Sequence, residues 1–316
     1  MKIAWLFPGQ GSQEVGMGRS VAEAYASARA VFDEADAALG ETEGRSLSSL
    51  CFEGPLEALT LTANTQPALV ATSAAIVAAI REAHPSLPAP TVALGHSLGE
   101  YSALTAAGAL TLSDAVRLCR ARGEAMQAAV PPGQGSMAAV MGLEPAVLEA
   151  VCAEASRPEE PVSPANFNAP GQIVIAGSAG AVARALELAQ ARGAKCIPLK
   201  VSAPFHCALM RPAADALRTK LATVRVEPLR FPVIANVDAE PNADGARVSD
   251  LLVRQVDAPV QWTRSIERAA ASGVTLALEI GPGKVLAGLV KRIDKRIRVI
   301  NVADADAVAR LADELG

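Results

Sequence analysis

Short apolar segments alternate with longer helix-forming segments along most of this chain. IAWLF at 3–7 and TVALG at 91–95 are two of the apolar segments, and helical patterns cover 21–39, the stretch after Pro67 and the residues after 95. Short apolar runs bounded by turn residues are typical of buried strands. The β-α-β-α order therefore predicts an α/β protein with a mostly parallel sheet and helices on both faces.

A break in this alternation predicts a second domain. AVPPGQGS at 129–136 carries several turn-forming residues in a row, and the segments after it follow a β-α-β-β-α-β order as far as about Pro198. Longer α/β alternation then resumes. We predict a large catalytic domain formed by 1–127 and 200–316, and a small ferredoxin-like domain, 128–199, inserted in it.

Charge and composition argue against several classes of function. Twenty-nine Lys and Arg against 33 Asp and Glu give a net charge of −4, so no overall attraction to nucleic acid or anionic lipid is expected. The longest Ala-rich stretch, Pro67 to Ile80, is too short to span a bilayer, and the N-terminus lacks the apolar run of a signal peptide. We expect no membrane segment.

The cysteines indicate a reducing compartment. Their number is odd, they are widely spread, and no CxxC pair occurs among the five, which are Cys51, Cys119, Cys152, Cys196 and Cys207. Neither a disulfide framework nor a zinc site is indicated by this pattern. A monomeric cytoplasmic protein without a metal is the expectation.

Gly95-His96-Ser97-Leu98-Gly99 is a GxSxG sequence between an apolar strand and a helical pattern. A nucleophile elbow needs this context, because the glycines allow the sharp turn that exposes the serine and the helix N-terminus favours developing negative charge. A glycine-rich turn with an inert serine is the alternative. The strand and helix around the motif favour Ser97 as a nucleophile.

A serine nucleophile needs a base, and the chain has three histidines. His84 stands at a helix end, where a surface position beside the helix dipole explains it. His96 adjoins the serine, and on a sharp elbow its side chain should point elsewhere and order the site. His206, in a loop after a proline, remains as the candidate base.

Two glycine-rich segments could suggest nucleotide binding, but their spacing is wrong. Gly9 and Gly11 begin a GxGxxG pattern whose third position is Glu14. GPGKV at 281–285 resembles a P-loop, yet Leu278 stands in place of the first glycine and Val285 in place of Ser or Thr. No nucleotide cofactor is expected.

Seven ordered motifs resemble those of a known enzyme family. They are FPGQGSQ, GHSLGEYSAL, RLCRARGEAMQ, NFNAPGQIVIAG, PFH, VRQVDAPVQW and EIGPGKVL, and they extend from residue 3 to about 302. Together they resemble the malonyl-CoA:acyl carrier protein transacylases, relatives of the acyltransferase domains of fatty acid and polyketide synthases. The resemblance implies a large α/β-hydrolase-like domain, with malonyl-CoA and an acyl carrier protein as substrates and no cofactor.

The resemblance also implies a role for individual residues. Ser97 matches the acylated serine and His206 its base, and the backbone N–H groups of Gln10 and Leu98 match the oxyanion hole. Arg122 matches the arginine that pairs with the malonyl carboxylate, a task that suits a planar guanidinium. The other implied positions are Gln255, whose backbone carbonyl orients the histidine, and the substrate-binding residues His96, Asn166, Asn168 and Phe205.

Two positions in these motifs bear on the acyl group. In related domains a Gln after the nucleophile and a Ser before the histidine accompany methylmalonyl selection, and this chain has Leu98 and Phe205 there. Malonyl is therefore the expected acyl group, since a bulkier one should clash with Phe205.

Alternatives to a transacylase of fatty acid synthesis remain at this stage. The same parts would serve a malonyl acyltransferase acting in trans on a polyketide synthase. A serine esterase or thioesterase shares GxSxG, although such enzymes place the histidine late in the chain after an acid. A third reading is a carrier-protein docking module that has kept only the fold.

Overall fold

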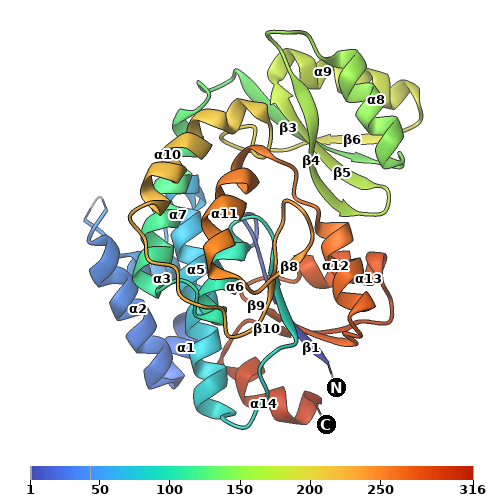
Figure 1. The fold of residues 1–316 in the computed structure, drawn as a ribbon. Coiled ribbons are helices and arrows are strands. Elements are labelled where there is room, and N and C mark those ends of the chain that lie inside the picture. The colour runs from blue at the N-terminus through green and yellow to red at the C-terminus, as the bar shows by residue number, and fades with distance from the viewer. Residues whose placement is uncertain (1, 43, 316) are drawn as a thin grey trace.

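Six strands from distant parts of the chain form one sheet, in the order β10-β9-β1-β2-β7-β8. The computed structural model describes residues 2–42 and 44–315 (Figure 1). All neighbouring strands are parallel except the short edge strand β8, which is antiparallel to β7. The strands are β1 (Ile3–Phe7), β2 (Val92–Gly95), β7 (Val233–Ile234), β8 (Pro241–Asn242), β9 (Leu276–Ile280) and β10 (Arg298–Val302).

Helices cover both faces of this sheet, as predicted. Ile3, Trp5 and Phe7 of β1 pack into one core with most of the helices, whereas Ala4 and Leu6 face a second core formed with α12 and α13. IAWLF is apolar throughout because both of its faces are buried. The helices are α1 (Arg19–Ala24), α2 (Ala26–Leu39), α3 (Leu47–Glu53), α4 (Leu56–Thr60), α5 (Thr62–Ala83), α6 (Gly99–Ala107), α7 (Leu112–Ala128), α10 (Arg211–Leu221), α11 (Val248–Asp257), α12 (Trp262–Ala271), α13 (Val285–Ile293) and α14 (Ala305–Leu315).

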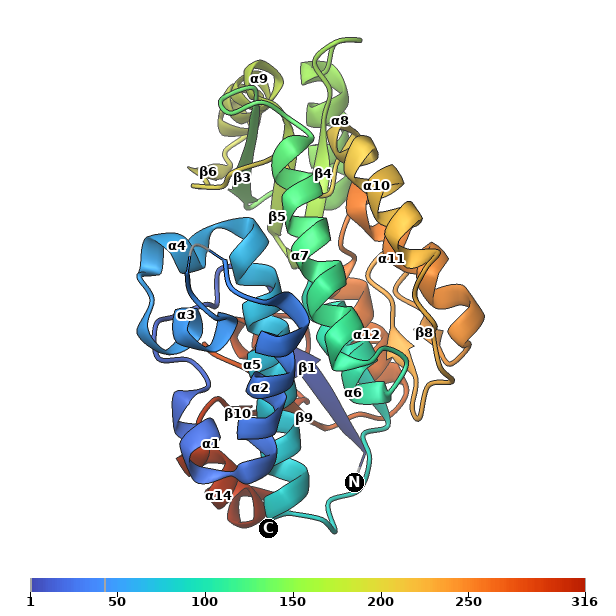
Figure 2. The ribbon, with the colours of Figure 1, turned by 90° about the vertical axis from the view of Figure 1, so that its left-hand side faces the viewer.

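A second, antiparallel sheet lies at one end of the molecule (Figures 1 and 2). Its strand order is β4-β5-β3-β6, and its elements follow one another as β-α-β-β-α-β. Helices α8 and α9 pack on one face through an aliphatic core. The elements are β3 (Gly135–Met141), α8 (Pro145–Ala155), β4 (Val162–Ala169), β5 (Gln172–Ser178), α9 (Ala179–Ala191) and β6 (Lys195–Pro198).

The opposite face of the second sheet contacts the loop before α10. Met137 and Val174 pack there against Cys207 of that loop, with Phe205 beside them. Figure 2 shows α7 and α10 side by side beneath this sheet. The loop that holds His206 is therefore fixed between the two sheets.

Two predictions about helices were wrong. The helical pattern over 21–39 is two helices, because Tyr25 has an extended backbone between α1 and α2. The Ala-rich stretch is longer than predicted, since α5 begins at Thr62 and contains Pro67, giving a helix of 22 residues. Within the described residues α5 is the one helix long and apolar enough to cross a membrane, but 83% of its most apolar window is buried, as in a core helix.

Candidate active site

Ser97 lies on a sharp turn between β2 and α6, at the carboxyl end of the parallel strands. Its φ is 52°, in the left-handed region that non-glycine residues rarely adopt. The flanking glycines permit the turn: a Cβ on Gly95 would lie 1.9 Å from the backbone of Gly99, and one on Gly99 would lie 2.3 Å from the carbonyl oxygen of Phe7. Close backbone packing therefore explains both glycines of GxSxG.

His206 faces Ser97 from the loop before α10. Its Nε2 lies 2.7 Å from Ser97 Oγ, and its Nδ1 lies 2.8 Å from the carbonyl oxygen of Gln255. A carbonyl can only accept, so Nδ1 carries the proton and Nε2 is left to accept the serine hydroxyl. His206 also has a positive φ, 59°. Both residues are held in strained conformations, which often mark functional sites.

The surroundings of His206 keep it neutral. The side chain is buried, and this burial, followed by the positive charge of Arg122, lowers the pKa of His206 from 6.5 to about 3. A neutral imidazole next to a serine hydroxyl can take its proton.

Arg122 is almost completely buried, with 1% of its surface exposed, and belongs to α7. Its Nη1 donates to Gln66 Oε1 at 2.7 Å, and its Nη2 donates to Gln255 Oε1 at 2.9 Å and to Ser97 Oγ at 3.1 Å. Its Nε has no hydrogen-bond partner among the described residues.

Its charge is not directly paired within the fold. No Asp or Glu oxygen of the described residues lies within ion-pair distance of the Arg122 guanidinium. Such burial is costly without a partner, so the guanidinium is a ready site for an anion beside the serine.

Two backbone N–H groups flank the serine. Gln10 follows β1, and Leu98 is the N-cap residue of α6. Neither N–H donates a backbone hydrogen bond in the part of the chain that the structure describes. Gln10 is also anchored by its side chain, which donates to Thr62 Oγ1 at 3.1 Å.

These groups open on a cavity of about 350 Å³ between the two sheets. His96 Nε2 lies 2.8 Å from Asn168 Oδ1, so the second sheet holds the imidazole at the wall of this cavity. Its ring packs on Trp262, and burial lowers the pKa of His96. The lining includes the predicted residues Gln10, His96, Ser97, Arg122, Asn166, Asn168, Phe205 and His206.

The side chain of Leu98 lies outside the cavity. Its side chain is 1% exposed and packs in the main core, and it is not among the residues that line the cavity. The reason is the elbow itself, since successive residues of a sharp turn point to different sides. Only the backbone of Leu98 faces the site, and Phe205 is left as the side chain that could limit the size of the acyl group.

Sequence analysis missed three polar side chains at the site. Gln66 bonds Arg122, Asn236 Oδ1 accepts the N–H of Ser97 at 2.7 Å, and Glu100 lies behind both Asn236 and Gln255. Asn236 had a usable signal, because it follows a buried strand at the edge where Ser97 lies. His84, by contrast, lies outside the site and contacts the carbonyl oxygen of Val308.

A serine on a sharp strand–helix turn, a histidine within hydrogen-bond distance of it and a buried arginine without an ion-pair partner among the described residues are the arrangement that a serine-nucleophile α/β enzyme requires. Comparison with known proteins narrows this class. The acyl transferase domain family matches residues 4–314. The malonyl CoA-acyl carrier protein transacylase of Bacillus subtilis is 48% identical over 97% of this chain and 95% of its own length. The chain therefore belongs to the acyl transferase family, among its malonyl-CoA–acyl carrier protein transacylases.

Solved structures agree with this assignment. An acyl carrier protein S-malonyltransferase from Vibrio cholerae superposes with a TM-score of 0.94 at 45% identity, and both chains are covered completely. A malonyl transacylase in complex with a type II polyketide synthase acyl carrier protein has a TM-score of 0.93 at 42% identity, covering 99% of this chain and 100% of that chain.

Proposed function

We propose that this chain transfers a malonyl group from coenzyme A to the phosphopantetheine thiol of an acyl carrier protein, through an ester on Ser97. One observation carries this proposal. Arg122 is buried without a carboxylate partner among residues 2–42 and 44–315, and its Nη2 lies 3.1 Å from Ser97 Oγ. One methylene separates the acyl carbonyl of malonyl from its free carboxylate, so an acyl group on Ser97 would place that carboxylate beside the guanidinium.

Acylation begins with proton transfer. His206 Nε2 takes the Ser97 proton, the serine oxygen attacks the malonyl thioester, and His206 returns the proton to the departing thiolate of coenzyme A. In the second half, the same Nε2 takes the proton of the carrier-protein thiol, the thiol sulfur attacks the malonyl ester, and Nε2 gives the proton to the departing Ser97 Oγ. The carbonyl of Gln255 keeps the imidazole in the tautomer that both halves require.

The backbone N–H groups of Gln10 and Leu98 would receive the negative charge of each tetrahedral intermediate. Neither N–H has a backbone acceptor among the described residues, which supports this role, and losing such a donor typically costs about a hundredfold or more in rate. We assign His96, Asn166, Asn168 and Phe205 to substrate binding, because they line the cavity around Ser97.

We also infer the finer architecture. The first sheet and its helices would form the α/β-hydrolase-like domain, 1–127 and 200–316, and the second sheet the ferredoxin-like insertion, 128–199. The β-α-β-β-α-β order and the antiparallel strand order β4-β5-β3-β6 support this division.

We place the reaction in the cytoplasm, in fatty acid synthesis, with a monomeric enzyme. All five cysteines are free, which fits a reducing compartment. The proposed steps need no cofactor, because the serine and histidine supply the chemistry and malonyl-CoA is a substrate. A malonyltransferase acting on a polyketide carrier protein is the second candidate, favoured by the similarity to the transacylase bound to such a protein. Rates with carrier proteins of both kinds distinguish the two.

Intact-protein mass spectrometry tests the central step. Incubation with malonyl-CoA should add one malonyl mass, which Ser97→Ala should abolish and Ser272→Ala, an exposed control beyond α12, should not. Absence of the adduct from the unmodified chain, or its survival in Ser97→Ala, would contradict the proposal. Hydrolysis of malonyl-CoA faster than transfer to carrier protein would instead favour an esterase or thioesterase.

A further inference from the structure

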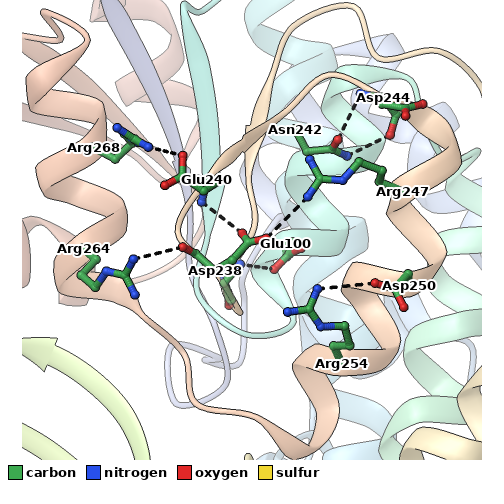
Figure 3. Close-up of polar contacts among 11 residues, drawn as sticks. Glu100, Asp238, Glu240, Asn242, Asp244, Arg247, Asp250, Arg254, Arg264 and Arg268 are labelled. Atoms are coloured by element: carbon green, nitrogen blue, oxygen red, sulfur yellow. Dashed lines mark hydrogen bonds and ion pairs between the residues drawn. The ribbon is translucent and has the colours of Figure 1, made fainter.

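Glu100, at the start of α6, has a buried carboxylate that the proposed acyl transfer does not use. Its side chain is 2% exposed, and it is in none of the ion pairs formed by the described residues. Figure 3 shows it beside Asp238. A single oxygen, Oε2, accepts the backbone N–H of Asn236 at 2.9 Å and the side-chain Nε2 of Gln255 at 2.9 Å. A buried carboxylate needs such partners, so its position is closely defined.

The first partner, Asn236, holds both sides of the elbow. Its Oδ1 accepts the N–H of Ser97 at 2.7 Å, and its Nδ2 donates to the carbonyl oxygen of Gly95 at 2.7 Å. The turn that follows Asn236 is anchored from outside: Arg247 pairs with Asp238 and Arg264 Nη2 lies 3.5 Å from its carbonyl oxygen (Figure 3). Glu100 fixes the same turn from within, through the N–H of Asn236.

The second partner, Gln255, contacts Ser97, Arg122 and His206. Its Nε2 also donates to the carbonyl oxygen of Ser97 at 3.0 Å, its Oε1 accepts Arg122 Nη2 at 2.9 Å, and its backbone oxygen accepts His206 Nδ1 at 2.8 Å. The amide can accept from Arg122 only if its NH₂ faces the other way. The carboxylate of Glu100 and the carbonyl oxygen of Ser97 are both acceptors on that side, so together they select the productive orientation.

We propose that Glu100 is a positioning residue for acyl transfer: by holding Asn236 and Gln255, it sets the elbow of Ser97 and the orientation of Arg122. This inference rests on the proposed function. The amide of Gln255 lies between the carboxylate of Glu100 and the guanidinium of Arg122, so the two opposite charges are near each other without direct contact. The arrangement balances the buried cation while leaving it free to bind a substrate carboxylate.

The charge of Glu100 is itself sensitive to this environment. Burial raises the pKa of Glu100 to about 7, with a smaller contribution from Asp238, while its hydrogen bonds from Asn236 and Gln255 and the charge of Arg122 act in the opposite direction. Both hydrogen bonds use Oε2, so a proton on the other oxygen leaves them in place. The positioning role therefore depends on an acceptor oxygen and does not require the full negative charge.

The variants Glu100→Gln and Glu100→Ala separate the role of the acceptor oxygen from that of the negative charge. The glutamine can present its oxygen where Oε2 lies and keep both hydrogen bonds, whereas alanine removes the acceptor. We expect Glu100→Ala to slow acylation of Ser97 by malonyl-CoA about a hundredfold per folded molecule, as a small misplacement of reacting groups can do. Glu100→Gln should lose less than about fivefold, within the range of a retained neutral hydrogen bond.

Two further measurements distinguish positioning from a loss of folding. Circular dichroism and thermal melting give the folded fraction of each variant, with Glu267→Ala, an exposed glutamate on α12, as the matched control. Labelling of Ser97 by phenylmethylsulfonyl fluoride, which has no carboxylate, should also slow in Glu100→Ala, because the elbow is displaced.

The possible outcomes are separable. Acylation of the unmodified chain by malonyl-CoA establishes the proposed function independently of Glu100. A folded Glu100→Ala variant with an unchanged acylation rate, or a Glu100→Gln variant as slow as Glu100→Ala, would overturn the positioning role. Slower malonyl transfer with an unchanged rate of labelling by phenylmethylsulfonyl fluoride would also overturn the proposal that Glu100 sets the elbow of Ser97, since only the orientation of Arg122 would then be affected.

Discussion

Replacing Arg122 with methionine removes a buried positive charge and keeps an unbranched side chain in the core. A carboxylate about 4 Å from a guanidinium gains about 4 kcal/mol at an effective dielectric constant of about 20. Removing one member of a buried ion pair costs about 3–5 kcal/mol in measured cases, because the other is left uncompensated. We therefore expect Arg122→Met to lower kcat/KM for malonyl-CoA by about 10² to 10⁴-fold.

Acetyl-CoA supplies the control substrate, because its acyl group has no carboxylate. Its kcat/KM should change by less than about tenfold, the order of one lost hydrogen bond, since Arg122 donates to Ser97 Oγ in the free site. Steady-state transfer to carrier protein, measured with both thioesters, gives the ratio. Equal losses of kcat/KM for malonyl-CoA and acetyl-CoA would refute the reasoning, because Arg122 would then stabilise the site without binding the malonyl carboxylate.

The Arg122→Met variant also tests how the buried charge affects stability. No carboxylate of the described residues pairs with Arg122, so folding meets the desolvation cost of its charge without a direct ion pair. Arg122→Met removes that desolvation cost but leaves the Oε1 atoms of Gln66 and Gln255 without their donor, so we expect the free energy of unfolding to change by less than about 2 kcal/mol. Urea unfolding measures this, and a loss above about 2 kcal/mol would contradict it. Arg122→Lys keeps the positive charge but loses the planar guanidinium, so its kcat/KM for malonyl-CoA should lie between those of the unmodified chain and Arg122→Met.

Four other predictions depend on the geometry of the site. Because the pKa of folded His206 is lowered to about 3, the imidazole stays neutral as the pH falls, and kcat/KM should show no titration near pH 6.5; a decline centred there would contradict the assignment. His206 binds a proton near pH 6.5 in the unfolded chain but only near pH 3 in the folded one, so it lowers the free energy of unfolding as the pH drops from about 6.5 towards 3. Urea unfolding of His206→Ala should show a weaker dependence on pH over this range. Gly99→Ala places a Cβ 2.3 Å from the carbonyl oxygen of Phe7 and should lower the melting temperature and abolish Ser97 acylation, whereas normal acylation would show that the elbow tolerates a side chain. Phe205→Ala enlarges the cavity and should raise the kcat/KM ratio of methylmalonyl-CoA to malonyl-CoA at least about tenfold, the low end for a pocket contact of this kind; an unchanged ratio would remove Phe205 from selection.

Features that depend on short stretches of chain could be predicted from the sequence. The apolar runs at 3–7 and 91–95 predicted buried parallel strands, and both lie in the first sheet. GxSxG predicted the elbow, because its glycines are needed for backbone contacts within the turn and with the adjacent strand. The three-histidine count and the PFH motif at 204–206 led to His206.

Tertiary structure decided what depends on residues far apart in the chain. Ser97 and His206 are separated by 109 positions, and Arg122 and Gln255 by 133, so no local pattern could measure their contacts. The lowered pKa of His206 arises from burial and from a guanidinium on another helix. The missed roles of Asn236 and Glu100 have the same cause, because each acts through hydrogen bonds to residues far away in the chain. By itself, the sequence determined which groups could do the chemistry, and packing between distant elements decided which of them face the substrate and in what state of charge.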